Sequence, residues 1–288
     1  MSVAVVTDST AYLPVDLVER HGIRIVPLHV ILGGQQFREG VDVTTAQVAT
    51  ALRKFTPVST SRPSPQAFLD VYEAAAADGA EAVVSVHISA DMSGTVESAA
   101  LAASQSPIPV EVVDSRSMGM AMGFAVLSAA VAASKGRDAK AVAAIAGSRA
   151  GAASVIFYVD TLEYLRRGGR IGVASALLGS VLAIKPLLAL ADGHIQAIEK
   201  VRTSARALSR LEELAVQAAA AAGESGADVA VHHLDSQTRA SDLAERLRAR
   251  VAPTTSVVLV ELGAVVGAHV GPGTIAVAVS PRPSADQD

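Results

Sequence analysis

The chain has 288 residues, of which half are apolar and only 3% aromatic, with no Trp and no Cys. This length can bury a substantial core, as one large domain or two modest ones, and that core must consist mainly of Ala, Val, Leu and Ile. The net charge of −4 argues against a nucleic-acid partner. The absence of Cys excludes disulfides and thiolate chemistry and fits a reducing, cytoplasmic location.

Strand-like and helix-like segments alternate through the first half of the chain. Short apolar runs are followed by cap or turn residues and then by helical segments, as at Thr44-Thr45 and Ser64-Pro65. This order predicts a parallel or mostly parallel sheet covered by helices. The predicted strands are residues 3–6, 23–32, 82–88 and 110–113, and the predicted helices are residues 14–21, 44–54, 64–77, 94–104, a segment from 118, and 138–150.

Beyond about residue 153 the pattern changes to α+β with antiparallel pairing, including a hairpin turn at residues 191–194. We therefore predict an N-terminal α/β domain (residues 1–153), a C-terminal α+β domain (154–281) and a polar tail (282–288). In the second domain the predicted strands are residues 154–159, 186–190, 195–201, 229–233, 257–262 and 275–279, and the predicted helices are 161–166, 175–182, 205–222 and 241–251.

One uncharged stretch, residues 117–134, approaches the length of about 20 residues that a membrane-spanning helix needs. It consists mostly of Ala, Gly, Ser and Met and lacks the Leu, Ile and Phe density that drives insertion. We predict a buried helix here. We expect neither a secretion signal nor an integral membrane segment.

Three short segments combine glycine with a reactive polar side chain: residues 92–95, 164–170 and 269–274. Glycine lets backbone N–H groups approach a ligand closely, and the adjacent Ser, Arg and His side chains can engage an anion. Because the rest of the chain is so apolar, this combination suggests one anionic headgroup on an otherwise hydrophobic ligand.

Each polar residue also has a purely structural interpretation. Ser93, with the Gly94 N–H, could receive an anion at a helix N-terminus, or Ser93 could simply be an N-cap. Thr60 and Ser61 lie in a predicted loop before another helix, which they could merely shape. His269 precedes Gly-Pro-Gly, so we predict that it lies on a sharply defined loop, as a ligand contact or a structural hydrogen-bonding group.

Several classes of site are absent from the sequence. His232 and His233 are neighbours in a predicted strand and therefore point to opposite faces, so they are poorly placed to share a metal ion. There is no clustered His/Asp/Glu spacing, no Walker-type Gly-Lys-Ser/Thr, and no Gly-x-Ser-x-Gly around Ser93. We expect no metal, no cofactor and a buried His87.

Taken in order, these segments resemble the DegV family, the bacterial fatty-acid-binding subunits that serve fatty acid kinases. The resemblance covers nearly the full chain. It implies two α/β domains with a lipid tunnel between them, a bound long-chain fatty acid, and a separate ATP-binding kinase subunit that forms acyl-phosphate. The motifs that carry it are residues 7–10, 60–64, 93–95, 114–115, 164–171, 185–188, 200–202 and 269–273.

The resemblance also implies roles for particular residues. Arg170 and Arg202 match positions that the family uses to dock the kinase or to support phosphoryl transfer. The family commonly has Gln where this chain has Arg62, which adds a charge beside the headgroup loop. The residues implied to contact the fatty acid carboxylate are Thr60, Ser61, Ser93, Gly94 and His269.

The expected function is therefore a fatty-acid carrier that presents the carboxylate to a kinase and has no turnover of its own. Burial of an acyl chain contributes about 0.8 kcal/mol per methylene, whereas burial of the carboxylate is costly unless hydrogen bonds receive it. The alternative is a Ser/His esterase or acyltransferase. It would use Ser93 and His269, with Asp8 or Asp114 orienting the imidazole.

Overall fold

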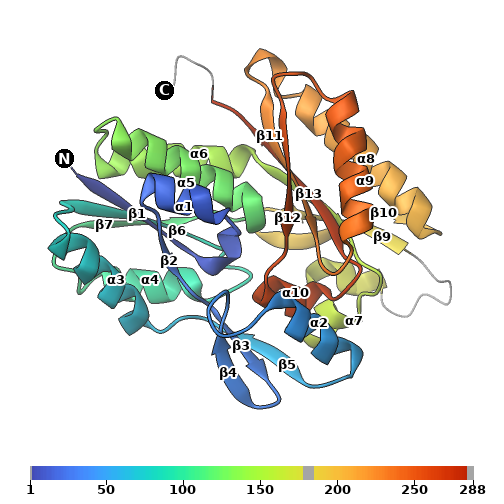
Figure 1. The fold of residues 1–288 in the computed structure, drawn as a ribbon, viewed down its shortest axis with the longest axis horizontal. Coiled ribbons are helices and arrows are strands. Elements are labelled where there is room, and N and C mark those ends of the chain that lie inside the picture. The colour runs from blue at the N-terminus through green and yellow to red at the C-terminus, as the bar shows by residue number, and fades with distance from the viewer. Residues whose placement is uncertain (1, 178–184, 284–288) are drawn as a thin grey trace.

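The structure, a computed structural model, describes residues 2–177 and 185–283. The chain forms two α/β domains, one built on a parallel sheet and one on a mixed sheet (Figure 1). In the first domain four parallel strands lie in the order β2-β1-β6-β7. Every residue of β6 is buried, as expected for a strand with helices on both faces. The strands are β1 (Val3–Asp8), β2 (Arg24–Val26), β6 (Ala82–His87) and β7 (Val110–Asp114).

Helices cover both faces of this parallel sheet (Figure 1). Phe68 and Tyr72 of α3 and Ala99 of α4 pack on one face, whereas Met122 of α5 and Val142 of α6 belong to the core on the other face. The short η1 (Ser9–Ala11) follows β1. The helices are α1 (Val15–His21), α3 (Pro65–Ala77), α4 (Thr95–Ala103), α5 (Gly119–Ser134) and α6 (Ala139–Ala152).

The second domain has a six-stranded mixed sheet in the order β10-β9-β8-β13-β11-β12, in which only β11 and β12 pair in parallel. Helices α8 and α9 cover one face, and the other face turns toward the first domain (Figure 1). The predicted hairpin is confirmed, with His194 pairing with Ala191. The elements are α7 (Glu163–Arg167), β8 (Ser154–Tyr158), β9 (Lys185–Ala191), β10 (His194–Val201), α8 (Ser204–Ala220), η3 (Gly223–Ser225), β11 (Ala227–His233), α9 (Gln237–Arg250), β12 (Ser256–Glu261) and β13 (Ile275–Pro281).

A third, small sheet was not predicted. Its order is β4-β3-β5, all antiparallel, with β3 (His29–Leu32), β4 (Gln35–Arg38) and β5 (Val58–Ser61). The prediction of one strand over residues 23–32 is wrong: the chain leaves the parallel sheet after β2 and enters this one as β3. Pro27 lies at the break and has no backbone N–H to donate to a ladder. Thr60 and Ser61 accordingly lie at the end of a strand rather than in a loop.

A second correction concerns His269, which lies in helix α10 (Ala264–Val270) and not on a loop. This helix has only seven residues, and three Val and one Gly among them give little helical signal, so it depends on its tertiary contacts. It packs against α2 (Thr45–Arg53) and the small sheet through Val265 and Ala268. Gly271 ends the helix with φ of +78°.

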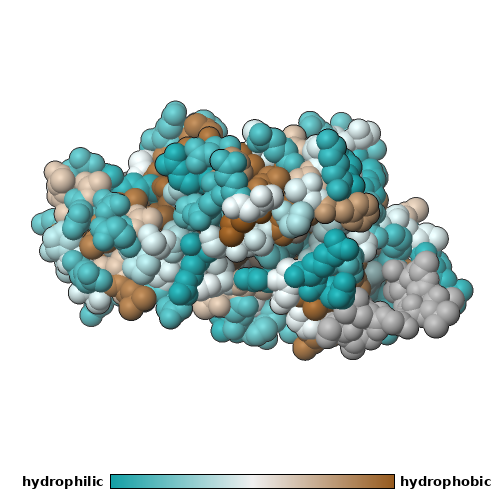
Figure 2. All heavy atoms as spheres, turned by 90° about the horizontal axis from the view of Figure 1, so that it is seen from below, coloured by the Kyte–Doolittle hydropathy of each residue, from teal (hydrophilic) through white to brown (hydrophobic). Residues whose placement is uncertain are grey.

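Two further predictions concern the middle of the chain. Residues 175–182 were predicted to be helical; η2 (Gly172–Leu177) is a 3₁₀ helix, and the remainder lies outside the described residues. The uncharged stretch forms α5, most of which is buried. No helix in the described part of the chain combines the length and apolarity needed to cross a membrane. On the face shown in Figure 2, hydrophilic residues predominate and hydrophobic residues occur in separate patches.

Candidate functional site

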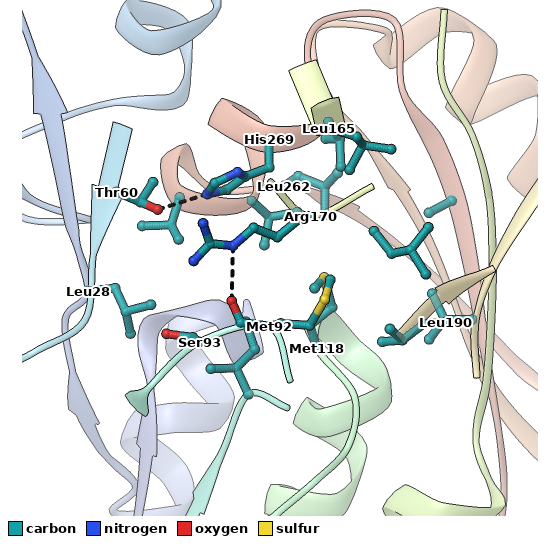
Figure 3. Close-up of a pocket in the computed structure, with 18 of the residues that line it drawn as sticks. Leu28, Thr60, Met92, Ser93, Met118, Leu165, Arg170, Leu190, Leu262 and His269 are labelled. Carbon is teal, nitrogen blue, oxygen red and sulfur yellow. Dashed lines mark hydrogen bonds between the residues drawn. The ribbon is translucent and has the colours of Figure 1, made fainter. Parts of the chain in front are cut away.

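A largely apolar cavity of about 320 Å³ lies between the two domains. This volume falls within the range of about 300–1,000 Å³ that is typical of small-molecule sites. The parallel-sheet domain and the mixed-sheet domain both contribute to its walls (Figure 3). The apolar lining consists of Leu28, Ile88, Met92, Met118, Val155, Phe157, Leu165, Leu190, Ile195, Leu262, Val265, Val266, Val270 and Ala276.

Polar side chains gather toward one end of this cavity. Figure 3 shows Thr60, Ser93, Arg170 and His269 near one another, with Leu190 farther along the apolar wall. The Oγ1 atom of Thr60 lies 2.8 Å from Nε2 of His269, so a hydrogen bond joins β5 to α10. Four residues predicted from far apart in the sequence therefore meet at one place.

His269 is an uncharged hydrogen-bonding group at neutral pH. Burial, together with the nearby Arg170 guanidinium, lowers the pKa of His269 to about 4. Its Nδ1 atom is buried and finds no hydrogen-bond partner among the described residues. The ring packs directly on Gly168, because a Cβ at that position would collide with Nδ1. The absence of a side chain at Gly168 therefore makes room for the His269 imidazole.

Ser93 and Gly94 form the second part of the polar end. Gly94 occupies the N-cap position of α4. The purely structural interpretation of Ser93 as the N-cap is therefore wrong. Instead, Oγ of Ser93 lies 2.8 Å from Oγ1 of the fully buried Thr95. Each hydroxyl can both donate and accept, so Thr95 leaves Ser93 able to donate to a ligand.

Arg170 lines the cavity, and its guanidinium is held in place by two backbone carbonyls. Its Nε donates to the Met92 carbonyl (3.2 Å) and its Nη1 to the Gly168 carbonyl (2.7 Å), which links the two domains beside the polar end (Figure 3). Arg202, in contrast, is exposed just after β10 and is not among the described lining residues. The docking role of both arginines stays a prediction.

Arg62 and Ser61 also line the cavity beside Thr60. The Arg62 guanidinium is half-exposed, forms an ion pair with Glu97 and donates to the Gly94 carbonyl (3.3 Å). The added charge at this position is thus offset by a carboxylate. Arg62 also covers Gly94 so closely that a Cβ there would collide with it.

His232 is a lining residue for which sequence reasoning assigned no role. Burial lowers its pKa to about 4, and its Nε2 accepts a hydrogen bond from the Met120 N–H at 3.1 Å. A paired, uncharged imidazole can form part of an apolar wall. Alternation along the strand predicted that His232 and His233 face opposite sides, but it could not tell which side faces a cavity.

The residues proposed for an esterase do not form a catalytic triad. Asp8 is fully buried and its Oδ2 lies 3.1 Å from Nδ1 of His87, whose Nε2 is 2.6 Å from Oγ of Ser85. Asp8 is therefore paired with His87, which is buried as predicted, and not with His269. Asp114 accepts hydrogen bonds from backbone N–H groups instead. Ser93 and His269 have Thr95 and Thr60 as their hydrogen-bond partners.

A second, more polar hollow of about 600 Å³ lies between α5, α6 and the end of β13. It contains none of the predicted site residues, and its Arg149 and Arg282 are paired with Asp228. Among the described residues, no group of three or more His, Asp and Glu side chains is placed to hold a metal ion. The inter-domain cavity is therefore the candidate site.

Comparison with known proteins identifies the family. Residues 2–282 match the family model described as uncharacterised protein, DegV family. A DegV domain-containing protein of Streptomyces coelicolor is 51% identical over 280 residues, covering 97% of this chain and 99% of the relative. One from Mycobacterium tuberculosis is 38% identical and covers 97% of each chain. The chain belongs to the DegV family, as the sequence motifs predicted.

Solved structures agree with this assignment and confirm the predicted fold class. A DegV family protein of Thermus thermophilus, described as binding a fatty acid, has a TM-score of 0.91 at 35% identity, covering 98% of this chain and 100% of the other. DegV of Bacillus subtilis, described as a fatty acid binding protein, has a TM-score of 0.90 at 32% identity with the same coverage.

We predict that Gly168→Ala disrupts the polar end of the cavity, because the new Cβ would displace the His269 ring from Thr60. Overpacking of this kind costs about 1–3 kcal/mol. Thermal unfolding and the ¹⁵N histidine NMR signals would measure the loss of stability and of the His269–Thr60 contact. Gly151→Ala in α6, where no atom lies near the added Cβ, is the control and should lower neither. An unshifted His269 signal in Gly168→Ala would contradict this packing.

Proposed function

We propose that this protein binds a long-chain fatty acid in the inter-domain cavity, with the acyl chain along the apolar walls and the carboxylate at Thr60, Ser93 and His269. The observation that carries the proposal is the division of a single cavity into an apolar part and a hydrogen-bonding end. The fatty-acid binding described for the relatives from Thermus thermophilus and Bacillus subtilis supports it.

The apolar walls would provide most of the affinity. Each buried methylene contributes about 0.8 kcal/mol, so a long chain gains on the order of 10 kcal/mol before the entropic costs of association. The apolar residues of the lining are aliphatic apart from Phe157 and the two methionines, Met92 and Met118. Such walls fill the space around a flexible chain without presenting unpaired polar groups.

The polar end would offset the cost of burying the carboxylate. In the tautomer with its proton on Nε2, His269 donates to Oγ1 of Thr60, which leaves the Thr60 hydroxyl proton free to donate to the ligand. Ser93, supported by Thr95, and the Gly94 N–H at the start of α4 would donate from the other side. Arg170 would add a positive charge near the carboxylate, and its guanidinium is already held by hydrogen bonds to two backbone carbonyls.

The bound acid would then be presented to a separate ATP-dependent kinase subunit, and the protein would act as a carrier without turnover of its own. This finer role rests on the family resemblance. Arg170 beside the headgroup and the exposed Arg202 are the side chains proposed to contact the kinase or to support phosphoryl transfer. A cytoplasmic location would give access to both the acid and ATP.

We predict that the purified protein carries a fatty acid, detectable by native mass spectrometry or by lipid extraction. Ser93→Ala should weaken palmitate or oleate binding about tenfold, because a buried carboxylate oxygen loses one donor. Ser98→Ala in α4, the helix that follows Ser93, is the control: its hydroxyl is buried and finds no partner in the described part of the chain. If the wild-type protein neither carries nor binds a fatty acid, the proposal is wrong.

We predict that Arg202→Ala retains fatty-acid affinity but lowers the rate of acyl-phosphate formation when the ATP-dependent kinase partner is supplied. The expected reduction is about tenfold, as for removal of one charge-assisted contact. Arg137→Ala, another exposed arginine but one that lines the second hollow, should leave both quantities unchanged. Normal acyl-phosphate formation by Arg202→Ala would remove Arg202 from the docking surface.

A further inference from the structure

Helix α10 brings His269 to the cavity, yet its first turn is held by residues from the other end of the chain. The side chain of Glu39, just after β4, reaches this turn, and its Oε1 accepts a hydrogen bond from the Val265 N–H at 2.8 Å. The Tyr12 hydroxyl accepts from the Val266 N–H at 3.3 Å. Two of the backbone donors that a helix leaves unpaired at its start are thereby satisfied.

The carboxyl group of Glu39 also joins α10 to the first domain. Its second oxygen, Oε2, accepts from the Ser9 hydroxyl at 2.5 Å, and the Ser9 hydroxyl accepts from the Leu28 N–H at 3.0 Å. Tyr12 donates to Oε1 at 3.4 Å. One side chain therefore connects η1, the start of the small sheet and α10, and Leu28 and Val265 on either side of it line the cavity.

The space for this carboxyl group is closely fitted. Glu39 is only 5% exposed, and a Cβ at Gly263 would collide with both its Oε1 and the Tyr12 ring. Burial of a carboxyl group carries a large desolvation cost, which an apolar residue at position 39 would avoid. The hydrogen bonds of Glu39 to α10 supply a reason for its presence.

We propose that Glu39 is a positioning residue for the carboxylate-binding end of the cavity: it fixes the first turn of α10 and thereby sets His269 against Thr60. This inference rests on the proposed function. His269 lies one turn after Val265 on the same short helix, so a displacement of the first turn moves the imidazole with it. The acyl-binding walls depend on Glu39 much less, because most of them come from other elements.

The test compares an acid with a neutral ligand of the same chain length. We expect Glu39→Ala to weaken palmitate binding about tenfold and hexadecanol binding less than about threefold, because only the acid needs the placed donors. Glu39→Gln should restore palmitate binding, since its amide can accept from the Val265 N–H and donate to the Ser9 hydroxyl. Equal losses for both ligands, or no loss, would overturn the proposal.

A second measurement separates this inference from the proposed function. The ¹⁵N signals of His269 in the ligand-free protein should shift in Glu39→Ala and stay near their wild-type positions in Glu39→Gln. The buried Glu212, paired with Arg246 and Arg250 on the outer helices, provides the matched control Glu212→Ala, which should leave these signals unchanged. If no fatty acid binds at all, the proposed function fails, and the His269 signals still decide the role of Glu39.

The pH dependence of stability gives an independent check on the environment of Glu39. Burial raises the pKa of Glu39 from 4.5 to about 7, Asp8 at the end of β1 adds to the increase, and the hydrogen bonds from Ser9, Val265 and Tyr12 oppose it. The folded state therefore binds an extra proton between these values, and stability falls as the pH rises from about 4.5 to about 7. Glu39→Gln does not ionise, so its Tm relative to wild type should increase between pH 5 and pH 8. A difference independent of pH would contradict the buried carboxyl.

Discussion

The desolvation of a single negative charge is the main constraint that the proposed function places on this architecture. A hydrocarbon chain is stabilised wherever an aliphatic cavity exists, but a carboxylate is tolerated only where donors already point at it. In the proposed complex the donors are the Thr60 and Ser93 hydroxyls and the Gly94 amide, with His269 orienting the Thr60 hydroxyl and the Arg170 guanidinium nearby. These groups come from β5, the start of α4, α10 and the segment after α7. No single domain supplies all of them, so the packing of the two domains is what assembles the site.

The sequence predicted those parts of the fold that have local signals. Ser64 caps α3 and Pro65 begins it, as in the prediction of a helix over residues 64–77, because cap and Pro at the first turn act within a few residues. The β9–β10 hairpin follows from its Asp-Gly turn with positive φ at both residues. The alternation of strands and helices likewise indicated the parallel sheet of the first domain.

The remaining features depend on contacts distant in sequence. Residues 264–270 carry no helical pattern, and α10 exists because Val265 and Ala268 are buried against α2 and the small sheet. Thr60 was assigned to a loop because β5 is short and pairs only with β3. Motif resemblance nevertheless selected Thr60, Ser93 and His269, which line one cavity, and their contact with a carboxylate stays a prediction. The apolar lining, including Leu28 and Phe157, has no signal that distinguishes it from ordinary core.

The uncharged helix α5 has a consequence for how a ligand can enter and leave. It packs against β1 and β6 of one domain and against β11 and β13 of the other, and a single hydrophobic cluster runs from Val84 through Met122 to Ala230 and Ala278. Rotation of one sheet away from the other would expose this shared core to water. Entry of the proposed ligand by a local movement would leave this shared core buried, whereas entry by separation of the two sheets would not.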